Sequence, residues 1–311
     1  MMSGTGGGYD FLSGPSPEDL RKKVQKAKDE EKTKQYEREL EGFLGGMLTQ
    51  FNDRDVEKTN QHLETIKKAL DKDIEGTVDL RFGGSVEKHT YVDGISDVDS
   101  LVLLNDAELS KLSPSEIKDY FFNRLKERLP NTTITVGKMA VTVKFEDHET
   151  QLLPAVKAES GFLVSSPDGK KWSSVRPQKF AENLTKINKS CGGKLVPTIK
   201  IAKGIVSSLP EMKRLSGYHT EALANSIFSS YKGPQTVKDM IRHFFTEASK
   251  RVQTPIKDPS GQSAYLDSYL GKSGSLQRKI VADSLSRISR KINNADNVSN
   301  LNGWKDLFGE F

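Results

Sequence analysis

The chain has 311 residues, of which 35% are hydrophobic and 29% charged, and its formal net charge is +5. These values are typical of a soluble globular protein with an ample core. No stretch approaches the roughly 20 apolar residues that span a bilayer, and the N-terminus lacks an apolar signal core, so we expect a cytoplasmic protein without a membrane segment. The single cysteine, Cys191, excludes an internal disulfide framework. The mild positive charge suits phosphate-bearing ligands but is no strong nucleic-acid signal.

The N-terminal part predicts a short tail followed by two helices. Residues 1–15 are rich in glycine and serine and are expected to form a flexible tail. Residues 17–41 are dense in Lys and Glu, and Pro17 is typical of the first turn of a helix. A second helix is predicted over residues 53–75, where apolar residues recur at helical spacing.

After the second predicted helix, the spacing of the apolar residues changes from helical to alternating, which indicates strands. Residues 78–82 alternate apolar and polar side chains. Residues 97–104 become almost wholly apolar after their acidic residues, as expected of a central strand covered on both faces. Further along, the sequence predicts one helix over 115–129 and strands over 132–145, with a break at Gly137, and over 149–155.

The strand signal fades from about Asn183 onward, and helices are predicted near 178–190, 195–209, 219–230, 235–251 and 275–293. Strands followed by a run of helices favour an α+β fold, with a mixed sheet and a C-terminal helical lobe. We therefore expect a sheet domain with the N-terminal helices over residues 16–175 and a helical lobe over 176–311.

The residues that carry chemistry lie in FGGSVEKHTYVDGISDVDSLVLL, residues 82–104. Glycines such as Gly84 let a backbone approach a triphosphate closely, and Ser85 at a helix start adds donors where anions bind well. Asp97 and Asp99 are two residues apart on a strand and therefore share one face. Paired carboxylates favour a cation between them, and Mg²⁺ prefers such oxygen ligands, so the pattern predicts a metal site beside a phosphate site.

This motif resembles the signature of DNA polymerase β-type nucleotidyltransferases. With Lys88, Thr90 and Ser96 before the acids, the fuller string is similar to the bacterial cGAS-like and DncV-like enzymes, the CD-NTases of CBASS anti-phage systems. The resemblance implies a nucleotidyltransferase palm that joins NTPs such as ATP or GTP into a cyclic di- or oligonucleotide. It also implies two Mg²⁺ ions, with Mn²⁺ as a substitute, and CBASS accessory or effector proteins as partners.

Downstream residues extend the resemblance in the expected order over roughly residues 53–230. Lys200 and Lys203 lie on one predicted helix, as the family's triphosphate-contacting lysines do. Ser216 and Tyr218 match a stretch that opens a later helix, where the tyrosine stacks on a base. We expect Lys203, Ser216 and Tyr218 to bind the nucleotide. His219 is interpreted as a structural hydrogen-bonding residue.

The third acid departs from the family pattern. The family places it three residues before a proline, and here that position is Gln151 before Pro154. An amide ligates Mg²⁺ weakly and carries no charge. Glu149 lies two residues earlier, on the same strand face and about 7 Å away, so we favour Glu149 as the third acid, with Gln151 as the alternative.

Two other functions stay open on the sequence alone. One is a template-independent transferase that extends RNA or oligoadenylate, and the other is a catalytically silent nucleotide-binding module, which Gln151 supports. The C-terminal segment NGWKDLFGEF is expected to be an exposed apolar tail that a partner protein could bind.

Overall fold

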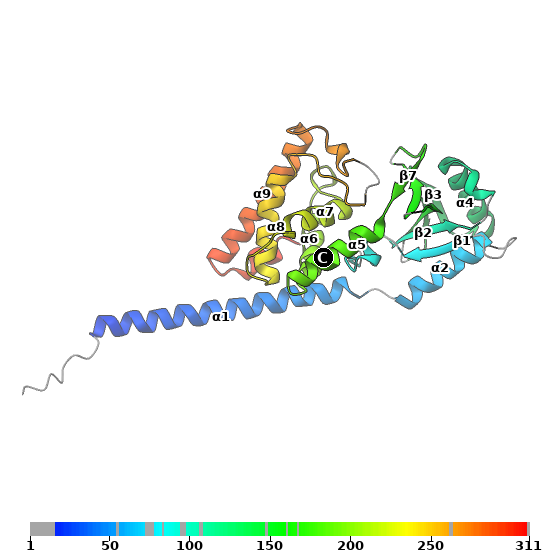
Figure 1. Ribbon diagram of the computed structural model, residues 1–311. Helices are drawn as coiled ribbons and strands as arrows, with labels where there is room; N and C mark the ends of the chain where they lie inside the picture. Colours follow the sequence, from blue (N-terminus) through cyan, green and yellow to red (C-terminus); the bar gives the residue numbers. More distant parts are fainter. Residues whose placement is uncertain are drawn as a thin grey trace, which may run out of the picture.

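The computed structural model describes residues 16–53, 56–71, 78–82, 84–93, 98–105, 108–146, 149–159, 161–166, 168–260 and 264–309. A twisted sheet with its own helices forms one part of the molecule, and a helical lobe lies beside it (Figure 1). A long N-terminal helix runs beneath the lobe and projects well beyond it. Among these residues, no helix is long and apolar enough to cross a membrane.

The sheet is mixed, which confirms the predicted α+β class. Its main order is β1-β2-β5-β4-β3; β6 also pairs with β5, and β7 pairs with β6. Strands β2 and β5 are parallel, whereas the other pairs are antiparallel. The strands are β1 Val78–Phe82, β2 Val98–Leu104, β3 Thr133–Val136, β4 Val141–Lys144, β5 Glu149–Lys157, β6 Phe162–Ser165 and β7 Trp172–Val175.

Strand β2 is buried on both faces, as its apolar run predicts. Val102 and Leu104 pack in a cluster with helices α2 (Val56–Asp71) and α4 (Pro114–Arg128), which cover one face of the sheet. Leu101 and Leu103 point to the opposite face and pack with residues of β5, β6 and β7. Asp99 has the parity of this second group and therefore points away from α2 and α4.

The helical lobe has one large core to which nearly all of its helices contribute. Its helices are α5 Pro177–Ser190, α6 Leu195–Ser207, α7 Gly217–Phe228, α8 Val237–Arg251, α9 Leu276–Asn297 and α10 Leu301–Lys305. Short 3₁₀ turns at Glu211–Lys213 and Ser268–Leu270 connect them, and another, Leu109–Lys111, precedes α4.

Helix α1, Pro17–Phe51, packs on the helical lobe, not on the sheet. Its buried residues recur every three or four positions from Tyr36 to Phe51 and form one stripe: Tyr36, Leu40, Leu44, Met47 and Phe51. The Tyr36 hydroxyl donates to Asp296 at 2.8 Å and accepts from Trp304 at 2.9 Å. From the sequence we expected this helix to belong to the sheet domain, but it packs on the helical lobe. The helix also continues ten residues beyond its predicted end at residue 41.

The C-terminal segment corrects another expectation. Trp304, Leu307 and Phe308 are buried in the helical core, and Phe308 meets Phe43 of α1 edge-on at 5.6 Å between ring centroids. The apolar residues that we expected to be exposed thus close the bottom of the lobe. This packing removes the basis for treating them as a ready-made partner-binding tail.

Candidate active site

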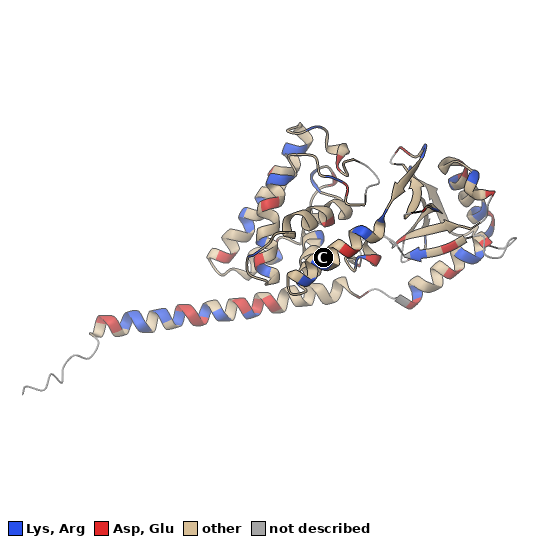
Figure 2. Ribbon diagram, in the orientation of Figure 1, with Lys and Arg blue, Asp and Glu red and all other residues tan. Residues whose placement is uncertain are grey.

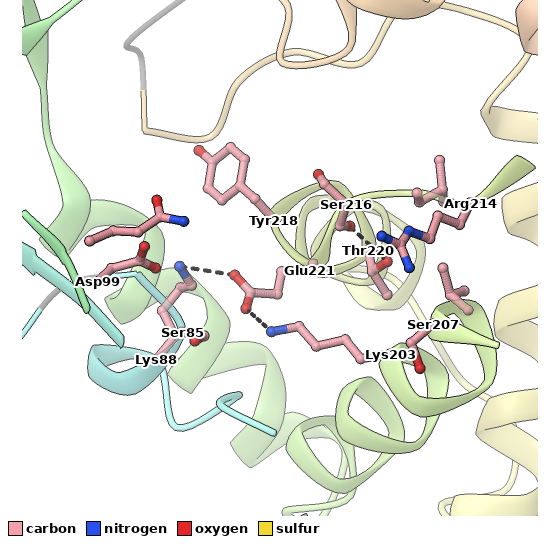
Figure 3. Close-up of a pocket in the computed structure, with 14 residues that line it drawn as sticks. Ser85, Lys88, Asp99, Lys203, Ser207, Arg214, Ser216, Tyr218, Thr220 and Glu221 are labelled. Atoms are coloured by element: carbon pink, nitrogen blue, oxygen red, sulfur yellow. Dashed lines mark hydrogen bonds and ion pairs between the residues drawn. The ribbon is translucent and has the colours of Figure 1, made fainter. Parts of the chain in front are cut away.

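A cavity of about 380 Å³ lies between the sheet and the helical lobe. Both parts contribute to it, so the residues predicted from separate motifs come together here (Figure 3). Its lining consists of Ser85, Lys88, Asp99, Gln151, Lys203, Val206, Ser207, Arg214, Leu215, Ser216, Gly217, Tyr218, Thr220 and Glu221.

The sheet presents Asp99 and Gln151 to the cavity from neighbouring parallel strands. The two residues are direct partners in the register of β2 and β5. Both point to the face opposite α2 and α4, at the end of the sheet that faces the helical lobe. Asp97 belongs to the same motif but lies outside the described residues, as does Ser96.

Glu149 stands apart from this lining. It is the first residue of β5, opposite Lys144 of β4, and its carboxylate forms an ion pair with Lys144 at 2.8 Å. The Glu149 carboxylate raises the pKa of Lys144 through this hydrogen bond and through its charge. Glu149 shares the strand face of Gln151, as predicted, but the cavity wall at this position is formed by Gln151.

The glycine-serine motif lies where the chain leaves the sheet for the helical lobe. Gly84 begins the short helix α3, Gly84–Glu87, and Ser85 lines the cavity while 7% exposed. The backbone then turns back on itself, with the Thr90 amide donating to the Ser85 carbonyl at 2.9 Å. The residues after this turn reach the helical lobe, since Val92 is part of the helical core.

A buried carboxylate, Glu221 of α7, links the two parts. Its Oε1 accepts a hydrogen bond from Lys203 Nζ at 2.6 Å, and its Oε2 forms an ion pair with Lys88 Nζ at 2.9 Å. The Thr90 hydroxyl also donates to Oε1, and the Thr90 carbonyl accepts from Lys203 at 2.9 Å. Figure 3 shows Glu221 between the two lysines.

In this network, the positive charges of the two lysines exceed the negative charge of Glu221. Burial alone would raise the pKa of Glu221, but the charges of Lys203 and Lys88 and hydrogen bonds from Lys203 and Thr90 hold it below its ordinary value. Glu221 is therefore ionised at neutral pH. The two ammonium groups that face the Glu221 carboxylate leave an excess of positive charge on this wall of the cavity, and Arg214 adds to it. Such a wall attracts a polyphosphate.

Tyr218 lines the cavity and lies above Lys88 and Glu221 in the view of Figure 3. Its hydroxyl donates to Asp258 at 2.6 Å, and its ring meets Phe180 edge-on at 5.7 Å. Lys88 Nζ lies 5.4 Å from the centroid of the Tyr218 ring. Burial and the hydrogen bond to Asp258 raise the pKa of Tyr218, so the hydroxyl stays protonated.

The N-terminus of α7 also faces the cavity. Ser216 is its N-cap and accepts a hydrogen bond from the His219 amide at 3.2 Å. Gly217 packs against the Lys203 side chain, since a Cβ there would lie 3.4 Å from Lys203 Cε. His219 itself points away from the cavity and contacts Tyr269 at 3.0 Å, in agreement with the predicted structural role.

Lys200 and Lys203 lie three positions apart on α6 but make different contacts. Lys203 is 4% exposed and faces Glu221. Lys200 donates to Asn52 at the end of α1 and borders another hollow, lined in part by Tyr91. The two lysines therefore do not meet in the cavity, contrary to what their shared resemblance to phosphate-binding lysines implied.

Sequence reasoning missed Glu221, Thr220 and Arg214. A signal for Glu221 was present, because it is the single charged residue in the otherwise apolar or neutral segment GYHTEALANSIF of α7. A lone acid on the buried face of a helix needs a cationic partner. The identity of that partner depended on the fold, since Lys88 and Lys203 lie on other elements.

The donor atoms at Asp99 and Gln151 fit a divalent metal of the Mg²⁺ type. A carboxylate and an amide oxygen are hard ligands, and Mg²⁺ is usually held by one or two carboxylates together with substrate phosphates. Asp99 lies across the cavity from Lys203 and Arg214, which would face those phosphates (Figure 3). Within the part of the chain that the structure describes, no three His, Cys, Asp or Glu residues cluster as a metal site.

The sequence and the fold are both similar to those of known proteins. Residues 35–188 match the family model for the Second Messenger Oligonucleotide or Dinucleotide Synthetase domain. A cyclic AMP-AMP-AMP synthase from Acinetobacter sp. (strain ATCC 27244 / 9458) is 25% identical over 148 residues, which cover 46% of this chain and 42% of that protein. The match thus spans less than half the length of this curated relative.

Two solved structures share the fold. CdnC of E. coli MS115-1 with ATP has a TM-score of 0.62 at 13% identity, over 82% of this chain and 90% of CdnC, and it has also been solved in a complex with HORMA-deltaN. Vibrio cholerae DncV cyclic AMP-GMP synthase, bound to the linear intermediate pppA(3′,5′)pG, has a TM-score of 0.62 at 12% identity, over 94% and 90% of the two chains. Residues 35–188 of this chain belong to the CD-NTase family, the second messenger oligonucleotide or dinucleotide synthetases.

Proposed function

We propose that this protein joins NTPs into a cyclic di- or oligonucleotide second messenger in anti-phage defence and releases pyrophosphate. The observation that carries the proposal is the single cavity in which Asp99 faces Ser85, Lys203, Ser216 and Tyr218. A metal-binding acid, a basic wall for a triphosphate and an aromatic ring for a base are the parts that a nucleotidyltransferase needs.

The reaction is attack of a ribose hydroxyl on the α-phosphate of an NTP. Asp99, together with Asp97, would hold two Mg²⁺ ions, which supply charge neutralisation for the attacking and leaving oxygens. Ser85 lies on the sheet side of the cavity and Lys203 on the helical side, so together they would hold the triphosphate in place. Tyr218 would stack on the base, and the N-terminus of α7 at Ser216 would face the phosphates.

Product analysis tests the proposal directly. The purified protein is incubated with radiolabelled ATP, GTP, CTP and UTP, singly and together, in Mg²⁺ or Mn²⁺, and the products are resolved after phosphatase treatment. We expect a phosphatase-resistant cyclic product in wild type and none with Asp99→Asn. The matched control is Asp79→Asn, which alters an exposed acid on β1 outside the cavity and should leave the yield unchanged.

The same experiment separates the alternatives. A ladder of extended chains would favour the template-independent transferase. Gln151, whose amide stands where the family has an acid, favours a silent nucleotide-binding module, and that reading requires NTP binding without any product. A product that Asp99→Asn still makes at the wild-type rate would place the chemistry elsewhere.

Lys203 and Lys200 offer a second test, because they lie on the same helix. We expect Lys203→Met to weaken binding of a non-hydrolysable ATP analogue, since its ammonium group faces the cavity. Lys200→Met should not weaken it, because Lys200 donates to Asn52 outside the cavity. Equal losses in both variants would show that the triphosphate binds elsewhere.

A regulatory protein partner is proposed by analogy with the CdnC complex with HORMA-deltaN.

A further inference from the structure

We propose that Glu221 is a positioning residue that sets both the triphosphate-binding lysine and the base-stacking tyrosine; this inference rests on the proposed function. Glu221 is 1% exposed, so its charge has no bulk solvent to stabilise it. It is held instead by Lys203, Lys88 and Thr90, which come from two different parts of the molecule.

The first consequence concerns Lys203. A lysine ammonium group sits on a flexible four-carbon stem and has three donors. Glu221 and the Thr90 carbonyl take two of these donors, at 2.6 and 2.9 Å. The direction of the third donor is then set by the other two, and Lys203 lines the cavity. Glu221 thereby fixes the position from which Lys203 meets a phosphate.

The second consequence concerns Tyr218. Lys88 pairs with Glu221 while its Nζ lies 5.4 Å from the centroid of Tyr218 and 5.1 Å from that of Phe180. The distance from Lys88 Nζ to the Tyr218 ring is within cation–π range, so Lys88 occupies one face of that ring. A base that stacks on Tyr218 must use the other face. By holding Lys88, Glu221 selects the ring face that is left for the base.

A positioning role predicts a loss of turnover rather than of affinity. Glu221→Gln removes a negative charge that repels the triphosphate, and this change should favour binding. The lysines become less ordered in the variant, which should weaken binding, so the two effects on ground-state affinity offset each other. Misplacement of groups that hold the reacting atoms lowers the rate of the chemical step. We expect the turnover of Glu221→Gln to fall at least about tenfold, while its affinity for a non-hydrolysable ATP analogue changes less than about threefold.

Asp267→Asn is the matched control for the loss of a buried carboxylate. Asp267 is also fully buried in the helical lobe, forms an ion pair with Arg278 at 2.6 Å and does not line the cavity. Both variants are expected to lose stability. At a temperature where both are folded by circular dichroism, turnover per folded molecule should fall in Glu221→Gln alone. Equal falls in turnover in the two variants would show that Glu221 has only a structural role.

Two further measurements keep the inference testable under every outcome. If Glu221→Gln does not fold, Glu221→Asp retains the charge but is one methylene shorter, and its turnover should still fall. A crystal structure of the folded variant should show Lys88 displaced from the Tyr218 ring; unmoved lysines would overturn the inference even if the wild type makes no product. Absence of product from the wild type would refute the proposed function alone.

Discussion

At the residue scale, the chemistry proposed for the cavity depends on the exact positions of a few side chains. Asp99 and Gln151 are register partners on parallel strands, so a carboxylate and an amide stand side by side where the family pattern has two acids. The sequence favoured Glu149 as the missing acid. Its ion pair with Lys144 and its absence from the cavity lining instead support Gln151 as the residue beside Asp99.

The identity of the third metal ligand can be tested with three variants. We expect Gln151→Ala to lower turnover more than Glu149→Gln, because Gln151 faces the cavity and Glu149 faces Lys144. Gln151→Asp should preserve or raise turnover, since it adds negative charge next to Asp99. Steady-state rates in Mg²⁺ decide the matter. If Glu149→Gln costs about a hundredfold, as for a positioned acid–base group, and Gln151→Ala is silent, Glu149 is the third acid after all.

Tyr218 provides a residue-scale prediction about the base. Tyr218→Ala should weaken binding of a non-hydrolysable NTP by about 1–3 kcal/mol, the scale of aromatic stacking on a base. Tyr218→Phe keeps the ring and loses only the hydrogen bond to Asp258, so most of the affinity should remain. Isothermal titration measures both. Tyr231→Ala alters an aromatic side chain that packs on Phe228 away from the cavity and should bind like wild type; equal weakening there would indicate a general loss of structure.

At the element scale, helices α1, α6 and α7 position the helical wall of the site. Phe51 at the end of α1 packs onto Gly204 of α6, where a Cβ would lie 2.6 Å from the Phe51 ring. Lys203 precedes Gly204 and faces Glu221 of α7. The close approach of α1 to α6 therefore supports the helix that carries a residue of the site.

Two glycine-to-alanine changes test this close approach. Gly204→Ala should lower the free energy of unfolding by about 1–3 kcal/mol, because the added methyl group overpacks the α1–α6 contact. Gly45→Ala is the same change on α1, but apart from the chain neighbours and the backbone of the helix itself, no described atom lies within 4 Å of a Cβ there. It should be neutral or stabilise by up to about 1 kcal/mol, since alanine is the better helix former. Urea unfolding compares the two, and a stabilised Gly204→Ala would contradict the packing.

At the scale of the whole molecule, charge is distributed differently inside and outside. The projecting half of α1 carries a mixture of acids and bases that are exposed (Figure 2). In the interior of the lobe, the buried charged residues are paired, as in Glu221 with its lysines and Asp267 with Arg278. Buried charges of this kind make the stability of the fold depend on pH.

The pH dependence of stability has a definite sign. Burial lowers the pKa of His219 to about 4 from its ordinary 6.5, against the opposing effect of Asp267. Between these values the unfolded chain binds a proton that the folded protein does not. The stability that His219 confers is therefore complete above pH 6.5 and is lost as the pH falls toward 4. Glu221, whose pKa is also lowered, acts in the same direction below its ordinary value.

Urea unfolding at pH 7 and pH 5 measures this dependence. We expect the free energy of unfolding to be smaller at pH 5 in wild type, and the difference between the two pH values to shrink in His219→Gln. Glutamine keeps a group that can hydrogen-bond to Tyr269 but cannot gain a charge in this range. An unchanged difference in the variant would assign the acid sensitivity to other residues.

The sequence by itself determined the local features of this protein. The change from helical to alternating spacing located strands near β1 to β5, and the Asp-x-Asp before an apolar run located the strand that presents Asp99 to the cavity, because both signals involve neighbouring residues. Strands β6 and β7 escaped prediction, since β6 (FLVS) lacks a polar alternation and β7 (WSSV) places two serines side by side. A short strand is specified mainly by the neighbour with which it pairs.

Only the tertiary structure decided which distant residues meet. Thr90 and Glu221 are 131 residues apart in the chain, and Lys203 rather than Lys200 joins them because the fold turns that side of α6 toward the cavity. Burial of the C-terminal Trp304 likewise depends on a pocket built by α1 and its neighbours. Sequence periodicity reports which side of an element is apolar. The partner of that side, or of a buried charge, is set by packing across the whole chain.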